Sequence, residues 1–165
     1  MDLNNRKKVL ELLQNLEINF DLHEHPPTPT IEEAIKYWGE MDATHCKNLF
    51  FRNHKGNKHY LVIFEHRQQL AIRDLELKLK QGKLSFASEK RMAKFLGVKP
   101  GSVSLFGLIN DEKNQVFVFL DQNLLNSTFL SFHPNDNTAS LKISQADFRK
   151  FLKWTGNDYE FLELY

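Results

Sequence analysis

Residues 116–120 (Val-Phe-Val-Phe-Leu) form the most apolar run in the chain, and this run constrains the fold more than any other feature. A short run of β-branched and aromatic residues predicts a strand that is buried on both faces, at the centre of a sheet. Residues 45–53 and 60–65 are also typical of strands, and the turn-forming segment 54–58 between them predicts a hairpin. Strand and helix patterns intermix along the chain, so the sequence predicts an α/β protein with a mixed sheet.

Helices are predicted where apolar residues recur at helical spacing or where a capping residue precedes such a pattern. Residues 4–15 open the chain with this pattern. Thr30, Ser88 and Ser144 are predicted N-caps of helices that end near residues 38, 96 and 154, and Gly97 should end the second of these helices. The remaining expected elements are a short helix around 75–79 and strands near 18–25, 128–132, 138–143 and 159–164, the last at a sheet edge.

A single domain over residues 1–165 is expected, because a chain of 165 residues can bury about 70% of its unfolded surface. Cys46 is the only cysteine, which excludes an intrachain disulfide and suits a reducing compartment. The apolar runs are far shorter than the roughly 18 residues of a membrane span. We therefore expect neither a signal peptide nor a membrane association, and a cytoplasmic location.

The 22 basic and 21 acidic side chains nearly cancel, so the overall charge carries no nucleic-acid signature. Their distribution is uneven. Residues 9–42 hold eight acids and one base, whereas residues 78–99 hold seven bases and one acid. A basic stretch of this kind fits a solvated surface as well as it fits a set of phosphate contacts.

Lys47 interrupts the apolar pattern of the strand predicted over residues 45–53. Side-chain alternation places Lys47 on one face with Leu49 and Phe51, and Cys46 on the other. The pattern fits either an edge lysine with its ammonium in water or a lysine that reaches into a pocket. His45 and Cys46 are strand neighbours that point to opposite faces, so they cannot form a thiolate–imidazole pair, and we expect Cys46 to be a small buried residue.

Histidines and glycines mark other candidate sites. His23 and His25 share a strand face and His133 could approach them in space, but a lone His-x-His without a third ligand at zinc spacing predicts no metal site. The glycines of segment 101–107 would let the backbone approach a ligand closely, although a plain turn fits the same composition. The segment around His133 and Asn137 likewise fits an ordinary turn.

Three blocks of sequence, in a fixed order, carry a family resemblance. They are His45-Cys46-Lys47-Asn48-Leu49-Phe50-Phe51, then residues 84–89 with 96–104, then Phe132-His133-Pro134 with 137–139. Together they resemble the YbaK-type aminoacyl-tRNA editing family, whose members are freestanding relatives of the editing domain inserted into bacterial prolyl-tRNA synthetase. The blocks are most similar to the branch that removes alanine mischarged onto the proline tRNA.

The resemblance implies a compact domain with a strongly curved mixed sheet, and a cofactor-free hydrolase that deacylates mischarged tRNA, above all alanyl-tRNA for proline. It implies that Lys47 is the catalytic residue, as a proton-transfer group or as a positioning charge. It assigns substrate binding to His25, Gly101, Ser102, Val103, Ser104, His133 and Asn137, and tRNA binding to Lys83, Lys90, Arg91 and Lys94. The implied partners are the acceptor end of mischarged tRNA and prolyl-tRNA synthetase. A cysteinyl-tRNA deacylase and a non-catalytic aminoacyl- or nucleotide-binding module are the alternatives.

Two positions depart from the family pattern. The family's glycine loop reads G-x-x-x-P, and here Leu105 takes the place of the proline. Residues 71–73 read Ala-Ile-Arg where many relatives have Asp-Leu-Lys. The first departure bears on the rigidity of the loop and on the dimensions of the pocket.

Overall fold

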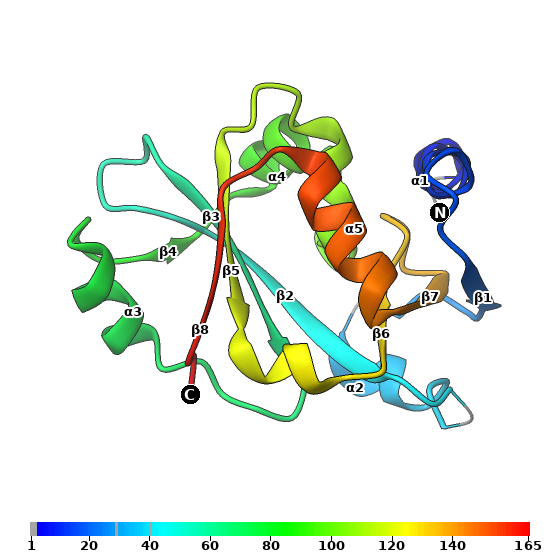
Figure 1. The fold of residues 1–165 in the computed structure, drawn as a ribbon. Coiled ribbons are helices and arrows are strands. Elements are labelled where there is room, and N and C mark those ends of the chain that lie inside the picture. Colours follow the sequence, from blue (N-terminus) through cyan, green and yellow to red (C-terminus); the bar gives the residue numbers. More distant parts are fainter. Residues whose placement is uncertain (1–2, 29, 40) are drawn as a thin grey trace.

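The computed structural model describes residues 3–28, 30–39 and 41–165. Within these residues, eight strands form a mixed sheet in the order β1-β7-β6-β2-β3-β5-β8, with β4 paired to β2 off this path (Figure 1). The strands are β1 (Phe20–Glu24), β2 (Thr44–Arg52), β3 (His59–Glu65), β4 (Ser85–Phe86), β5 (Val116–Asp121), β6 (Phe129–Phe132), β7 (Ala139–Ser144) and β8 (Tyr159–Leu162). The pairs β2–β6, β3–β5 and β5–β8 are parallel and the others antiparallel, which confirms a mixed sheet.

The helices begin and end mostly where local signals predict. They are α1 (Leu3–Asn15), α2 (Ile31–Ile35), α3 (Ile72–Leu79), α4 (Glu89–Leu96) and α5 (Gln145–Thr155), with the 3₁₀ helices η1 (Leu105–Asn110) and η2 (Gln122–Asn126). Thr30, Ser88 and Ser144 each accept a hydrogen bond from the backbone N–H three residues later, as N-caps do. Gly97 is left-handed, as predicted for the end of α4.

Other elements differ from the sequence prediction. The helix α2 ends at Ile35 instead of near residue 38, because the chain continues in tighter turns with bonds from Tyr37 N to Ala34 O and from Trp38 N to Ile35 O. The short strand β4 and both 3₁₀ helices were not predicted. Among the described residues, no helix is both long enough and apolar enough to span a bilayer.

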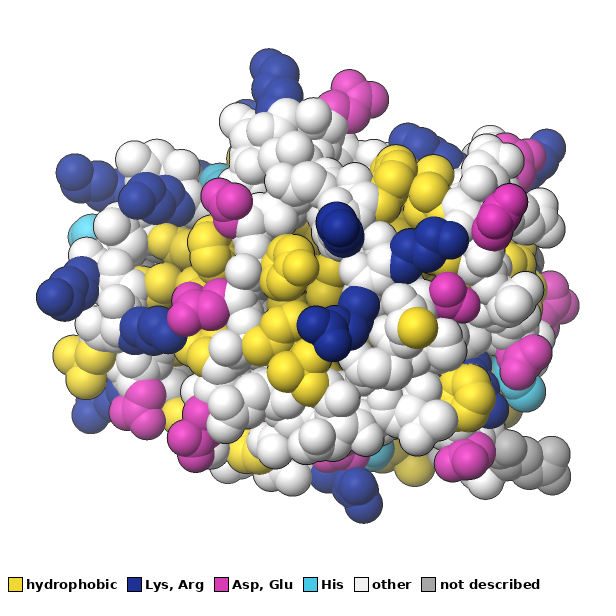
Figure 2. Space-filling view, viewed as in Figure 1, with side chains coloured by type: hydrophobic (Ala, Val, Ile, Leu, Met, Phe, Trp, Pro, Cys, Tyr) yellow, Lys and Arg dark blue, Asp and Glu magenta, His cyan; other side chains and the backbone are white. Residues whose placement is uncertain are grey.

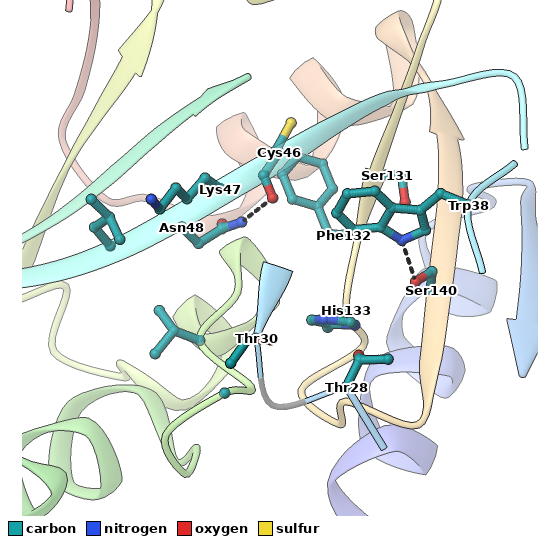
Figure 3. Close-up of a pocket in the computed structure, with 13 residues that line it drawn as sticks. Thr28, Thr30, Trp38, Cys46, Lys47, Asn48, Ser131, Phe132, His133 and Ser140 are labelled. Atoms are coloured by element: carbon teal, nitrogen blue, oxygen red, sulfur yellow. Dashed lines mark hydrogen bonds between the residues drawn. The ribbon is translucent and has the colours of Figure 1, made fainter. Parts of the chain in front are cut away.

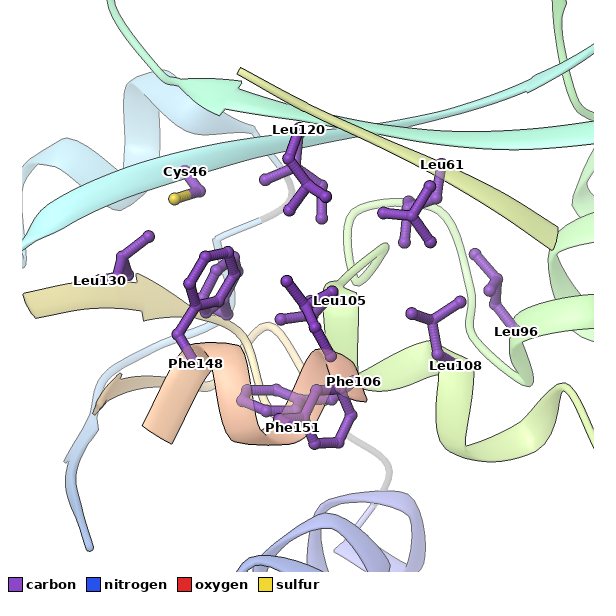
Figure 4. Packing of buried hydrophobic residues seen from close by; sticks show 14 of the residues in the cluster. Cys46, Leu61, Leu96, Leu105, Phe106, Leu108, Leu120, Leu130, Phe148 and Phe151 are labelled. Atoms are coloured by element: carbon purple, nitrogen blue, oxygen red, sulfur yellow. The ribbon is translucent and has the colours of Figure 1, made fainter. Parts of the chain in front are cut away.

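Two apolar clusters cover the two faces of the sheet. The larger cluster packs the sheet against α5, η1 and α4, and Figure 4 shows Leu105, Phe106, Phe148 and Phe151 filling this space. The smaller cluster lies on the opposite face and includes Leu75 of α3. Successive residues of β5 belong to one cluster or the other. The prediction that residues 116–120 form a strand with apolar contacts on both faces is therefore confirmed, but β5 lies next to the edge strand β8 and not at the centre of the sheet.

The strand β2 changes partners along its length, and this change creates room for a site. β3 follows one edge of β2 from Cys46 to Arg52. On the other edge, β6 pairs only with Thr44 and His45, and β4 pairs only with Phe51 and Arg52. Among the described residues, the edge between these two contacts has no strand partner, although Phe50 O accepts a bond from Ala87 N. Residues 46–50 thus present an open strand edge.

Candidate active site

A cavity of about 170 Å³ lies at this open edge of β2 (Figure 3). Side chains from distant parts of the chain enclose it, since β6, β7, the loop before η1 and the segment around α2 all contribute. The lining residues are Thr28, Thr30, Trp38, Cys46, Lys47, Asn48, Leu49, Gly101, Val103, Ser131, Phe132, His133 and Ser140. Of the predicted site residues, the fold therefore brings Lys47, Gly101, Val103 and His133 together around one cavity.

Lys47 is half-buried in the wall of this cavity. It is the one Lys, Arg, Asp or Glu among the described residues of the lining. Within the described part of the chain, its ammonium group has no hydrogen-bond or ion-pair partner. A fixed positive charge that is not neutralised by a protein carboxylate can stabilise negative charge that develops on a bound ligand.

Asn48, the next residue along β2, is held by the backbone of the glycine loop. Leu105 N donates to Asn48 Oδ1 at 3.0 Å, and Asn48 Nδ2 donates to Cys46 O at 3.3 Å. A proline at position 105 would have no N–H to donate. The departure from the family pattern therefore gives this chain a hydrogen bond that joins the loop to β2.

His133 faces β2 across the cavity (Figure 3). Its Nδ1 lies 2.7 Å from Ala139 O, and because a carbonyl only accepts, Nδ1 carries the proton. Burial is the main cause that lowers the pKa of His133, and the nearby His25 lowers it further. The imidazole is therefore neutral near pH 7, with Nε2 as a hydrogen-bond acceptor.

Ser140 connects the cavity wall to His25. Trp38 Nε1 donates to Ser140 Oγ at 3.2 Å. His25 Nδ1 donates to Pro26 O at 2.9 Å, so His25 Nε2 is left to accept the bond from Ser140 Oγ at 3.0 Å. His25 thus lies behind the wall and supports it, with its ring stacked on Tyr37 at 5.4 Å.

Three other predicted substrate contacts lie outside the cavity wall. Ser104 is fully buried, and its hydroxyl caps η1 by accepting from Phe106 N. Ser102 and Asn137 line a separate hollow of about 190 Å³. Asn137 O also accepts from Thr28 N at 3.0 Å, so Asn137 holds the segment that closes the cavity.

Several lining residues were missed by reasoning from sequence. The sequence predicts Trp38 only as the end of a helix, yet its indole lines the cavity and stacks on His45 with ring centroids 4.1 Å apart. Thr28 belongs to a proline-rich loop that carries no residue-specific signal. Ser131 and Ser140 are buried serines on β6 and β7. A serine inside an otherwise apolar strand is a signal that could have marked both.

Cys46 contributes no nucleophile. Burial raises the pKa of its thiol, and Sγ points toward Thr44 O at 3.6 Å. The prediction of a small buried residue is confirmed. No group of three His, Cys, Asp or Glu side chains among the described residues is arranged to hold a metal ion.

The four predicted tRNA contacts lie away from the cavity, on α4 and just before β4. Lys83, Lys90 and Lys94 are exposed. Arg91 is half-buried, and its Nη1 donates to Gly56 O at 2.8 Å and to His59 Nε2 at 2.8 Å. Arg91 is therefore engaged in the fold. Lys94 Nζ lies 5.2 Å from the centroid of the Phe95 ring, and the exposed Lys83 and Lys90 are available to contact a partner.

Known proteins resemble this chain along most of its length. Residues 25–151 match the family model of the aminoacyl-tRNA editing domain. The chain is 42% identical over 164 residues to the prolyl-tRNA editing protein ProX of Acetoanaerobium sticklandii, which covers 99% of this chain and 100% of that protein. It is 33% identical over 162 residues to the prolyl-tRNA synthetase associated domain-containing protein 1 of Mus musculus, covering 93% of this chain and 92% of that protein.

A solved structure shares the fold. A crystal structure described as that of a candidate trans-editing enzyme for prolyl-tRNA synthetase superimposes with a TM-score of 0.71 at 20% identity, over 96% of each chain. At this identity the likeness concerns the fold alone. It confirms the predicted α/β class with a mixed sheet flanked by helices.

Proposed function

Since this chain belongs to the aminoacyl-tRNA editing domain family and is thus an aminoacyl-tRNA deacylase, we propose that it removes alanine from mischarged proline tRNA, in trans and in the cytoplasm. The names of the relatives ProX and prolyl-tRNA synthetase associated domain-containing protein 1 support the proline tRNA as carrier and prolyl-tRNA synthetase as a partner. We propose that residues 1–165 act as one editing domain. The observation that carries the proposal is the small cavity with Lys47 in its wall.

The size of the cavity supports a small amino acid. Its volume of about 170 Å³ is below the range of about 300–1,000 Å³ that is usual for ligand pockets. Trp38, Phe132 and Val103 contribute apolar surface to its wall. Such a wall admits an alanyl side chain and rejects the larger proline. This rejection serves as a second selection step where binding alone discriminates by only about 1–3 kcal/mol per methylene.

The reaction is the hydrolysis of an ester. Water attacks the alanyl carbonyl carbon, the bond from that carbon to the ribose oxygen breaks, and a proton passes to the ribose oxygen, which yields alanine and uncharged tRNA. The ammonium of Lys47 stabilises the negative charge on the carbonyl oxygen as water adds. His133 Nε2 accepts a hydrogen bond from the substrate, and Gly101, with φ of +86°, lets the loop backbone approach closely.

The substitution Lys47→Ala tests this proposal. We expect the single-turnover rate on alanyl-tRNA(Pro) to fall by at least about 100-fold, as when one donor to a developing oxyanion is lost. The melting temperature should stay unchanged, because the ammonium group has no partner in the described part of the fold. Lys142→Ala is the matched control, since Lys142 is a half-buried strand lysine outside the cavity lining. An unchanged rate for Lys47→Ala would remove Lys47 from the mechanism.

The amino acid is decided by assaying alanyl-, cysteinyl-, seryl- and prolyl-tRNA(Pro) side by side. We expect alanyl-tRNA to be hydrolysed fastest and prolyl-tRNA to be spared. Faster hydrolysis of cysteinyl-tRNA would replace alanine by cysteine as the preferred side chain. The absence of turnover on all four substrates would contradict the proposal and favour a binding module.

A further inference from the structure

Phe86 presents an aromatic ring to solvent. Of its surface, 65% is exposed, although phenylalanine is usually buried. One face of the ring stacks on Phe51, with centroids 4.8 Å apart and an angle of 22° between the planes. Phe51 is itself only 1% exposed and belongs to the core. The ring of Phe86 is thus anchored on one side and available on the other.

Phe86 lies at one end of the open edge of β2, and the cavity lies along the same edge. Phe86 of β4 is paired with Phe51 of β2. Lys47 is four residues earlier on β2, on the same face as Phe51 because side chains alternate. At about 3.3 Å per residue, the two positions are separated by roughly 13 Å. Leu49 lies between them, on the same face, and also lines the cavity.

Basic side chains flank Phe86. Lys83 precedes it in the same segment, Lys90 follows in the first turn of α4, and both are exposed. Arg52 is paired with Ser85, the neighbour of Phe86. Lysine and arginine side chains gather over this side of the molecule, at the left of Figure 2, where Figure 1 places β4, α3 and the β2–β3 turn. Glu89 is the single acidic residue between positions 78 and 99.

An exposed aromatic ring among cations is the combination with which proteins bind single-stranded nucleic acid without reading its sequence. We propose that Phe86 is a stacking platform for an unpaired base near the 3′ end of the tRNA, while the terminal aminoacyl ester lies in the cavity beside Lys47. Lys83 and Lys90 neutralise the neighbouring phosphates. This inference rests on the proposed function, because it takes the occupant of the cavity to be the acylated end of a tRNA.

Two substrates distinguish an effect of Phe86 on base stacking from an effect on ester hydrolysis. Alanyl-tRNA(Pro) carries the unpaired bases, whereas the 3′-alanyl ester of adenosine carries the same ester and only the terminal nucleoside. For Phe86→Ala we expect KM for alanyl-tRNA(Pro) to rise at least about fivefold at unchanged kcat, since stacking of one base contributes about that factor or more. The rate on alanyl-adenosine should not change. Phe86→Trp should restore KM, because tryptophan keeps a stacking surface.

Leu77→Ala is the control for the loss of an exposed apolar side chain, because Leu77 of α3 is 75% exposed. We expect wild-type kinetics from it on both substrates. Wild-type KM for Phe86→Ala on alanyl-tRNA(Pro) would overturn the platform, and so would equal losses on both substrates, which indicate a structural role.

Absence of turnover by the wild-type protein on both substrates would contradict the proposed function and not the platform. In that case, the proposed stacking by Phe86 is tested by the affinity for a single-stranded oligoribonucleotide that ends in CCA, measured by fluorescence anisotropy. Weaker binding by Phe86→Ala than by Leu77→Ala would support it, and equal binding would overturn it.

Discussion

Leu105 shows how one residue can change the way a loop is held. Its side chain is fully buried against the sheet, and its N–H donates to the side chain of Asn48 at the cavity. The family's proline would supply a rigid φ angle but no donor. In this chain, a hydrogen bond and a buried side chain therefore hold the loop at the position where the family pattern has a proline.

Comparing Leu105→Pro with Leu105→Ala tests this role. Loss of the buried isobutyl group in Leu105→Ala should lower the free energy of unfolding by about 2–5 kcal/mol. Leu105→Pro also removes the donor to Asn48, so we expect its deacylation rate to be about fivefold lower than that of Leu105→Ala, in line with a net hydrogen-bond contribution of about 1 kcal/mol. Urea denaturation and single-turnover rates measure the two effects. Equal rates in the two variants would show that Asn48 does not need this bond.

At the scale of secondary-structure elements, α4 presents neighbouring basic residues with different roles. Arg91 joins α4 to Gly56 in the turn between β2 and β3 and to His59, the first residue of β3. His59 in turn packs on Phe95 of α4, with ring centroids 4.0 Å apart. Lys90 is exposed on the same helix. The basic stretch therefore combines a residue that stabilises the fold with residues that are free to contact phosphates.

The pair Arg91→Ala and Lys90→Ala should separate these roles. We expect Arg91→Ala to lower the free energy of unfolding by about 1–3 kcal/mol, because the buried His59 and the half-buried Gly56 O lose their donor. Lys90→Ala should change the free energy of unfolding by less than about 0.5 kcal/mol. The slope of log KM against log salt concentration for alanyl-tRNA(Pro) should decrease by about one in this variant. Wild-type stability of Arg91→Ala in urea denaturation would contradict the structural role.

Considered as a whole, the molecule buries histidines in their neutral form. Burial lowers the pKa of His45 and of His59 to about 4, and it is also the main cause that lowers the pKa of His66 and of His133. The unfolded chain has histidine pKa values near about 6.5. Between these values the unfolded state binds more protons than the folded state, so stability is fully present above about pH 6.5 and is lost as the pH falls toward 4.

We therefore expect the free energy of unfolding to decrease between pH 7 and pH 4.5. His45 and His59 should each contribute on the order of 1 kcal/mol of this loss by pH 5. His45→Phe should flatten the profile, since phenylalanine can keep the stacking on Trp38 and no hydrogen-bond partner of His45 Nδ1 lies among the described residues. His54→Gln, at an exposed position, is the control that should leave the profile unchanged. A profile that is flat from pH 7 to pH 5 would contradict this expectation.

Elements governed by local interactions were predictable from the sequence. Ser88 and Gly97 bound α4 because a cap acts on backbone groups three or four residues away. The strand β5 was predictable because its apolar run needs apolar contacts on both faces. The end of α2 and the strand β4 could not be predicted in this way. The strand β4 consists of two residues, which form a strand only because they pair with Phe51 and Arg52.

The features of the candidate site likewise separate into those that the sequence predicts and those that depend on the fold. The sequence was sufficient to predict the five α helices, seven of the eight strands in the described part of the chain and the caps. Through three motif blocks it also predicted the family and four of the residues around the cavity. Three features depend on tertiary contacts: Ser104 turns inward as a cap, Trp38 and Ser140 form part of the cavity wall, and Phe86 lies along the same edge of β2 as Lys47. These features could not be predicted because the cavity lies along the part of β2 that neither β6 nor β4 pairs with. The pairing of β2 with β6 and β4 joins segments that are far apart in the chain, and no local sequence pattern specifies such pairing.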